Sequence, residues 1–210
     1  MFNFLALAQE CAPNVAPDTL AAVVRVESTH NPFAIGVVGG YVKQPASLDE
    51  AVKTAESLEA AGKNFSLGIT QVNRYNLARV GLTYRTAFEP CANLRAGAQI
   101  LEECYTRASG KYDSTQAALH AALSCYYSGN FTRGFRPDAP GETPYVYKVL
   151  AAAGVTPPVV PSIKETSRPA SAERPPEEGP VLLRAERLKK ENAPEQAEEG
   201  AQKRNPKVAL

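Results

Sequence analysis

The chain changes composition sharply after residue 154. All of its aromatic residues, all four cysteines and both histidines lie in residues 1–154, whereas residues 155–210 carry nine prolines among mixed Lys, Arg and Glu. A segment of the second kind cannot bury enough apolar surface to offset the conformational entropy that ordering would cost. We therefore predict one folded domain over residues 1–154 and a Pro-rich, charged, disordered tail over residues 155–210.

Apolar residues of the predicted domain recur mainly at helical spacing, and several segments begin with a helix-start signal. The signals are a proline in the first turn or a serine cap. They stand at Pro17, Ser47, Ser66, Pro90, Ser114 and Pro144. The glycine-rich stretch 33–44 is the exception and favours extended structure. The predicted fold class is all-α, mainly helical, with a small β element around residues 33–44.

One predicted helix, in the segment DTLAAVVRVESTHN, carries a carboxylate on its apolar face. Glu27 lies on the same face as Leu20, Val23 and Val24, seven, four and three residues earlier. We expect this helix to end at Asn31-Pro32, because proline excludes helical geometry from the residue before it. A carboxylate at this place is either a paired structural group or an acid held neutral so that it can donate a proton. Taken by itself, the segment favours the structural role.

The cysteines are Cys11, Cys91, Cys104 and Cys125, and none forms a C-x-x-C pair. The histidines are also far from any cysteine pair, so we expect no metal site and no cofactor. Four scattered cysteines in a small domain fit two disulfides and hence an oxidising compartment. Three pairings are open, and buried free thiols in a cytosolic protein are the alternative.

Charge and hydropathy argue against nucleic-acid binding and against a membrane-spanning segment. The net charge is +1 and the domain has no basic block, so nucleic acid is not an expected partner. No run of about twenty apolar residues occurs, so we predict no transmembrane segment. The N-terminal MFNFLALAQECA lacks a basic region and is not a convincing signal peptide, so we interpret it as a first amphipathic helix. The route of export stays open.

Four motifs follow one another in the order found in the soluble lytic transglycosylase family. They are Glu27-Ser28, G-I-T-Q at 68–71, C-Y-Y-S-G at 125–129 and Tyr145-Val146. The family reads E-S, G-L-M-Q, A-Y-N-x-G and a late Y-V. Over roughly residues 5–150 the chain is also similar to one branch, the lytic transglycosylase subunit of type IV secretion and conjugation systems. NFSLGITQVNRYNL and ALSCYYSGNF carry much of that likeness.

The resemblance implies a goose-type lysozyme-like helical fold and a periplasmic enzyme. Its expected reaction cuts the β-1,4 bond between N-acetylmuramic acid and N-acetylglucosamine of peptidoglycan and leaves a 1,6-anhydro ring. Glu27 is the implied catalytic residue. The implied substrate-binding residues are Ser28, Gly68, Gln71, Tyr126, Tyr127, Gly129 and Tyr145. The expected partners are glycan strands and, through residues 155–210, other envelope subunits of a secretion system.

The expected positions of the other carboxylates support a reaction that uses Glu27 alone. Ordinary glycosidases need two carboxyl groups, roughly 5–9.5 Å apart. Only Glu27 falls on an apolar helix face, and the rest are expected at helix starts, on exposed faces or in loops. They include Glu89, Glu102, Glu103, Asp113, Asp138 and Glu142. A single carboxylate suits a substrate that supplies its own nucleophile.

Two positions depart from the family pattern. Thr70 stands where the family usually has Met, and Tyr127 stands where it usually has Asn. Two alternatives remain at this point. One is a lysozyme-type hydrolase with a second carboxylate, and the other is a murein-binding assembly factor whose activity is vestigial. Tyr127 is the feature that favours the assembly factor.

Overall fold

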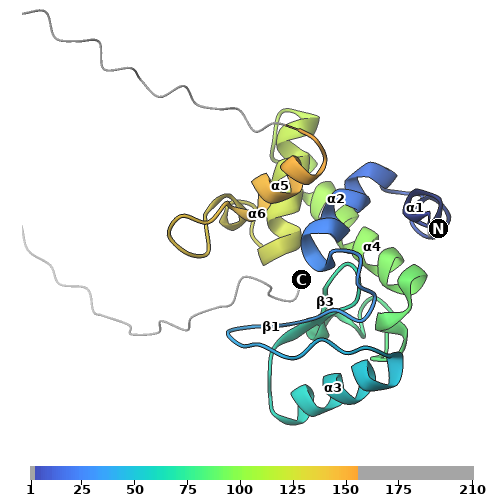
Figure 1. Cartoon of the computed structure of the whole chain (residues 1–210). Coiled ribbons are helices and arrows are strands. Elements are labelled where there is room, and N and C mark those ends of the chain that lie inside the picture. Colours follow the sequence, from blue (N-terminus) through green and yellow to red (C-terminus); the bar gives the residue numbers. More distant parts are fainter. Residues whose placement is uncertain (1–2, 156–210) are drawn as a thin grey trace, which may run out of the picture. The chain divides into compact units, whose positions relative to one another are not determined.

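The computed structural model describes residues 3–155, and within that range the chain is mainly helical with one small sheet (Figure 1). The α-helices are α1 (Phe4–Cys11), α2 (Pro17–Ser28), α3 (Leu48–Ala60), α4 (Pro90–Ser109), α5 (Thr115–Ser128) and α6 (Tyr145–Ala152). The strands are β1 (Ile35–Val37), β2 (Phe65–Leu67) and β3 (Val72–Asn73), and the 3-10 turns are η1 (Arg74–Asn76), η2 (Thr86–Phe88) and η3 (Arg133–Phe135). The predicted fold class is confirmed. The predicted tail beyond Val155 lies outside the described residues.

Helix starts are the part of the secondary structure that the sequence predicts best. The Ser47 and Ser114 side chains each accept a hydrogen bond from a backbone N–H three residues later, at 3.3 and 3.1 Å, as serine caps do. Pro17 and Pro90 open α2 and α4. The predicted end of α2 is wrong by three residues. The helix ends at Ser28 because Thr29 adopts a left-handed conformation, with φ 52°, before Asn31 is reached.

The predicted helix capped by Ser66 is wrong, because this segment forms a β-hairpin. β2 pairs antiparallel with both β1 and β3, with Ile35 opposite Leu67 and Ser66 opposite Asn73. The turn between β2 and β3 is 68–71, which begins and ends with left-handed residues, Gly68 at φ 76° and Gln71 at φ 52°. The sheet therefore includes the predicted element at 33–44 but draws two of its three strands from elsewhere.

The buried apolar residues of the described range form four groups, and the two largest each include residues of α4. One lies among α2, α4, α5 and α6, and the other lies between the sheet, α3 and α4. Figure 1 shows α3 and β1 at one end of this region and α5 and α6 at the other. Tyr126 of α5 packs against both groups. Within residues 3–155, no helix combines the length and apolarity needed to cross a membrane.

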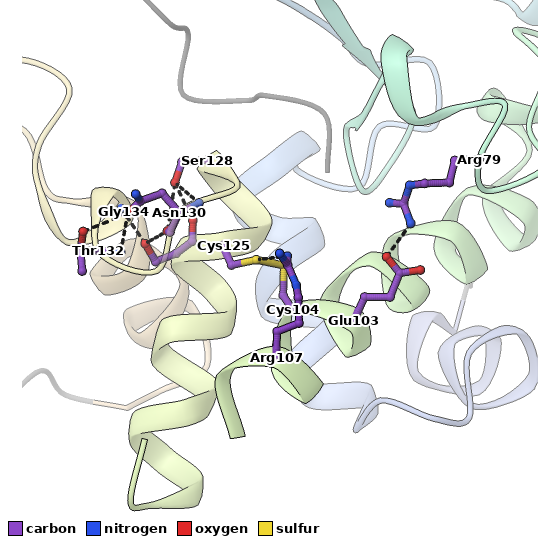
Figure 2. The surroundings of a disulfide bond; sticks show 10 residues. Arg79, Glu103, Cys104, Arg107, Cys125, Ser128, Asn130, Thr132 and Gly134 are labelled. Atoms are coloured by element: carbon purple, nitrogen blue, oxygen red, sulfur yellow. Dashed lines mark hydrogen bonds and ion pairs between the residues drawn. A yellow bond between two sulfur atoms is a disulfide. The ribbon is translucent and has the colours of Figure 1, made fainter. Parts of the chain in front are cut away.

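Two disulfides connect α4 to its neighbours, which confirms the predicted number and resolves the pairing. Cys11–Cys91 joins α1 to the start of α4, and Cys104–Cys125 joins the middle of α4 to α5. Figure 2 shows the second bond, with the Arg107 guanidinium 2.9 Å from Cys125 Sγ. No cysteine in the chain is free, so the alternative of buried thiols is wrong. Cys125 directly precedes Tyr126, so this bond fixes the end of α5 against α4.

Asn93, on α4, makes hydrogen bonds that fix the 68–71 turn. Its side chain is fully buried and accepts hydrogen bonds from the Thr70 backbone N–H at 2.8 Å and the Thr70 hydroxyl at 2.7 Å. Its amide nitrogen donates to the carbonyl oxygens of Leu67 and Ala87, at 3.0 and 2.7 Å. One buried amide therefore satisfies four polar groups that have no access to water.

Replacing Asn93 should destabilise the domain strongly. In Asn93→Ala the Thr70 N–H and the Leu67 and Ala87 carbonyl groups lose this partner, whereas the Thr70 hydroxyl can still donate to the backbone carbonyl of residue 93 at 3.0 Å. We therefore expect the free energy of unfolding to fall by about 2–4 kcal/mol. Urea unfolding followed by circular dichroism measures the change. Gln99→Ala, an exposed site on the same helix, is the matched control and should shift stability by less than about 0.5 kcal/mol. Equal stability of the two variants would contradict this account of the turn.

Candidate active site

The 68–71 turn is the point at which three helices meet the sheet. The carbonyl groups of residues 67–70 each accept a hydrogen bond from a side chain. The donors are Asn93 Nδ2 to Leu67 (3.0 Å), Gln71 Nε2 to Gly68 (2.8 Å), Ser28 Oγ to Ile69 (2.8 Å) and the Tyr126 hydroxyl to Thr70 (2.5 Å). Ser28, Asn93 and Tyr126 come from α2, α4 and α5, so the turn fixes those helices relative to one another.

Glu27 lies in the last turn of α2, next to this junction. Leu20, Val23 and Val24 are buried as predicted, and Glu27 is itself partly buried. The Tyr145 hydroxyl, from the start of α6, donates a hydrogen bond to Glu27 Oε1 at 2.7 Å. Residues 118 positions apart in the sequence are thus brought together, and the family motifs that contain them converge.

The negative charge of Glu27 influences the pKa of three tyrosines. Burial, followed by the negative charge of Glu27, raises the pKa of both Tyr126 and Tyr145 well above the ordinary value. The pKa of Tyr127 is also raised, first by burial and then by its hydrogen bond to Asp138. Each phenol therefore keeps its proton at neutral pH, and the Tyr145 hydroxyl remains a donor to Glu27.

The backbone around the site is strained. Among residues 3–155, the non-glycine residues with a left-handed φ are Thr29, His30 and Gln71. Two of them directly follow Glu27-Ser28, and the third ends the 68–71 turn. Such conformations cost roughly 1–3 kcal/mol each and persist only where surrounding contacts impose them. The His30 ring makes an edge contact with Phe4 of α1, at 5.2 Å between ring centroids.

Ser28 and Gln71 bind protein groups in this structure. The single hydroxyl proton of Ser28 is shared between the Ile69 carbonyl at 2.8 Å and the more distant Val24 carbonyl of its own helix at 3.2 Å. The Gln71 amide nitrogen donates to Ala34 at 3.0 Å as well as to Gly68. Sequence reasoning missed Gly36 beside this amide. A Cβ atom there would come within 2.6 Å of Gln71 Oε1. The sugar contacts expected of Ser28 and Gln71 stay predictions.

The two site glycines have separate structural reasons. A Cβ atom at Gly68 would collide with the Ala87 carbonyl oxygen and the Asn93 amide, so a glycine is needed here for packing against the protein interior. Gly129 ends α5 in the left-handed conformation, with φ 71°, as helix-terminating glycines commonly do. Their contacts with substrate also stay predictions.

Tyr127, which departs from the family pattern, lies against Tyr145. The two rings are nearly parallel, with centroids 4.5 Å apart and 13° between the planes. The Tyr127 hydroxyl donates to Asp138 Oδ2 at 2.5 Å, and Arg133 donates to Asp138 Oδ1 at 2.7 Å. Sequence reasoning placed Asp138 among the solvated carboxylates. No local pattern marks it, because its contact depends on how the loop after α5 folds back.

Known protein sequences match most of this chain. The sequence model of the family described as Transglycosylase SLT domain matches residues 4–139. The chain is 60% identical over 177 residues to the type IV secretion system protein virB1 of Brucella suis biovar 1 (strain 1330), covering 82% of this chain and 74% of the relative. It is 35% identical over 175 residues to protein virB1 of Agrobacterium fabrum (strain C58 / ATCC 33970), covering 81% and 68%. No solved structure matches the chain at a significant level.

The raised pKa of Tyr145 predicts how stability depends on alkaline pH. The unfolded chain loses this phenol proton near pH 10, whereas the folded protein retains it to higher pH. The stabilisation is therefore fully present below about pH 10. Above that value each such tyrosine lowers the free energy of unfolding by up to about 1.4 kcal/mol per pH unit.

Urea unfolding between pH 9 and pH 11 measures this slope. We expect a shallower decline for Tyr145→Phe than for the unmodified protein. Tyr41→Phe is the matched control, since Tyr41 is 88% exposed and its loss should leave the slope unchanged. Identical slopes for all three proteins would contradict the assigned environment of Tyr145.

Proposed function

Because the chain belongs to the transglycosylase SLT domain family, we propose that Glu27 is the single acid–base residue of its reaction. Family membership makes the chain a peptidoglycan lytic transglycosylase. The finer proposal is that it cleaves the β-1,4 bond between N-acetylmuramic acid and N-acetylglucosamine with formation of a 1,6-anhydro ring. The observation that carries it is the 2.7 Å hydrogen bond from Tyr145 to Glu27 Oε1.

The proposed reaction needs two proton transfers at one carboxyl group. Glu27 first donates its proton to the glycosidic oxygen, the C1–O bond breaks, and the N-acetylglucosamine side leaves with a 4-hydroxyl. The acetamido oxygen of the muramic acid can stabilise the positive charge at C1. The Glu27 carboxylate then takes the proton of the 6-hydroxyl as O6 bonds to C1. Glu27 ends protonated as it began, and no water is consumed.

Tyr145 supports the carboxylate stage of this cycle. After the first transfer Glu27 carries a negative charge, and a neutral donor at 2.7 Å stabilises that charge. A phenol of ordinary pKa, near 10, is already protonated at neutral pH, and the raised pKa of Tyr145 extends that range to more alkaline pH. Because the donor is positioned before the charge forms, it needs little reorganisation during the reaction.

Contacts of the other predicted carboxylates support the single-residue scheme. Glu102 accepts a hydrogen bond from Asn14 at 2.6 Å, and Glu103 is paired with Arg79. Asp138 accepts one hydrogen bond from Tyr127 of α5 and one from Arg133 of the loop after α5. These contacts give Glu102, Glu103 and Asp138 structural roles, which favours a scheme in which Glu27 acts alone. A retaining or inverting hydrolase would need a second carboxyl group.

The position of Tyr127 supports an active enzyme over a vestigial one. The sequence departure at this residue favours an assembly factor without activity. In the structure, however, its ring supports Tyr145, the donor to Glu27. The substitution therefore places a large side chain within the proposed site and does not leave a gap there.

We also propose a role in the cell envelope. Relatives with 60% and 35% identity are named virB1, and the name of the Brucella relative describes it as a type IV secretion system protein. Two disulfides suit an oxidising compartment such as the periplasm. The enzyme would then open peptidoglycan locally for the secretion machine. The predicted binding of envelope subunits by residues 155–210 concerns a segment outside the described residues.

The product of the reaction tests the chemistry. We expect digests of purified peptidoglycan to contain 1,6-anhydro-muramyl ends by mass spectrometry. Glu27→Gln should lower their rate of formation by at least about 10²–10⁴-fold, as loss of a general acid–base group does. Reducing ends in place of anhydro ends would establish a hydrolase and overturn the proposal.

The matched control for that experiment is Glu102→Gln. It makes the same chemical change at an exposed carboxylate that bonds Asn14, and it should retain full activity. Thermal unfolding of both variants shows that each is folded. A folded Glu27→Gln protein with normal activity would remove Glu27 from the proposed role.

The envelope role makes a separate prediction in cells. In a strain that lacks this gene, Glu102→Gln should restore substrate transfer by the secretion system, and Glu27→Gln should restore little of it. Transfer frequency is the measurement, and immunoblotting confirms equal protein levels. Full restoration by Glu27→Gln would favour the murein-binding assembly factor.

A further inference from the structure

We propose that Tyr127 and Asp138 are positioning residues that hold the Tyr145 hydroxyl on Glu27. The inference rests on the proposed function, in which Glu27 is the acid–base residue. It differs from the substrate-binding role that the family resemblance implies for Tyr127. It also adds Asp138, which sequence reasoning left among the solvated carboxylates.

The first step concerns the hydroxyl of Tyr127. Its single proton is donated to Asp138 Oδ2 at 2.5 Å, so the phenol is oriented by the loop after α5. The side chain is 6% exposed, and burial raises its pKa, which keeps that proton in place. The Tyr127 hydroxyl is therefore committed to Asp138, and it is the ring of Tyr127 that contacts Tyr145.

The second step concerns what holds Asp138. Its other oxygen accepts from Arg133 at 2.7 Å, and Arg133 also donates to the Arg136 carbonyl at 2.9 Å. An ion pair of two half-exposed groups would by itself be weak. Here it lies within a short loop whose backbone is held separately, so little additional entropy is lost when the pair forms.

The third step concerns that backbone. The Gly134 N–H donates to Ser124 Oγ at 2.8 Å, and the Ser124 hydroxyl donates to the Asn130 carbonyl at 2.6 Å. A Cβ atom at Gly134 would lie 2.8 Å from Ser124 Cα, so the loop is in direct contact with α5. Figure 2 shows Gly134, Asn130 and Ser128 gathered at this end of α5. Asp138 is therefore attached to the same helix that carries Tyr127.

The fourth step concerns how the position of Tyr127 affects the hydrogen bond from Tyr145 to Glu27. The Tyr127 ring lies nearly parallel to the Tyr145 ring, at 4.5 Å between centroids, and limits the orientations that Tyr145 can adopt. The Tyr145 hydroxyl is then directed at Glu27 Oε1. An Asn at position 127 has no ring to stack. The pair of Tyr127 and Asp138 thus gives this chain a support for Tyr145 that the usual family residue would not provide.

Kinetics of four variants test the proposal. Asp138→Ala and Tyr127→Phe should lower kcat by about 10- to 100-fold, because a small displacement of a catalytic contact has effects of that size. KM should change by less than about twofold, since a positioning role requires no contact of either residue with the sugar. Asp138→Asn should recover part of the loss, because its amide oxygen can still accept from Tyr127. Glu142→Ala removes another carboxylate of the same loop, 3.9 Å from Lys148, and should leave kcat unchanged.

A double substitution tests whether Asp138 acts through Tyr145. In a Tyr145→Phe background, Asp138→Ala should cause little further loss of kcat, because the contact that it supports is already absent. Independent, additive losses would overturn the proposal. So would an unchanged kcat in folded Asp138→Ala and Tyr127→Phe, or a raised KM with unchanged kcat, which would indicate sugar binding.

A measurement without substrate keeps this inference separate from the proposed function. NMR of ¹³C-labelled tyrosine should show faster ring flipping of Tyr145 in Asp138→Ala and the unmodified rate in Glu142→Ala. An unchanged Tyr145 signal in Asp138→Ala overturns the positioning role whatever the enzyme's activity. Absence of anhydro product from the unmodified protein would instead reject the proposed function, and the NMR result would still decide this inference.

Discussion

The turn at 68–71 depends on hydrogen bonds from side chains to its own backbone, and the site depends on that turn. Four successive carbonyl groups, from Leu67 to Thr70, have their partners in side chains, three of which come from α2, α4 and α5. Buried carbonyl groups must be paired, so the loss of one of these donors costs free energy. The helices that carry Ser28, Asn93 and Tyr126 are therefore held in one arrangement around the turn. Glu27, one residue before Ser28, receives its position from the same bonds.

Around Glu27 the protein combines a carboxylate with neutral phenols. Burial and the charge of Glu27 both raise the pKa of Tyr126 and Tyr145, so these groups donate hydrogen bonds without competing for the charge. Tyr126 uses its proton on the turn and Tyr145 uses its proton on Glu27. In the proposed mechanism, Tyr126 thus fixes the turn while Tyr145 supports the reacting carboxyl group. This division suits a reaction in which one carboxyl group alternates between acid and base.

The loop after α5 and the Cys104–Cys125 disulfide extend this scaffold. The disulfide fixes α5 to α4 directly before Tyr126, and the loop returns Asp138 to Tyr127. Both connections restrict the position of the end of α5. The adjacent residues Tyr126 and Tyr127 lie there, and their hydroxyl groups donate to Thr70 and Asp138, respectively. The left-handed residues Thr29 and Gln71 show that the backbone nearby is held by its surroundings rather than by local preference. The surroundings of the site are therefore rigid on several sides.

The sequence by itself determined the helical class, most helix starts and the face on which Glu27 lies. Those features depend on residues three or four positions apart, such as Ser114 with the backbone of Ala117, and local spacing records them. Four ordered motifs also identified the family before any contact was known. The tertiary structure alone decided that 64–76 is a hairpin, because the partners that pair its backbone come from β1 and from distant side chains such as Asn93. It likewise decided the cysteine pairing and the link from Asp138 to Tyr127, since no periodic pattern encodes which distant loop returns to a helix.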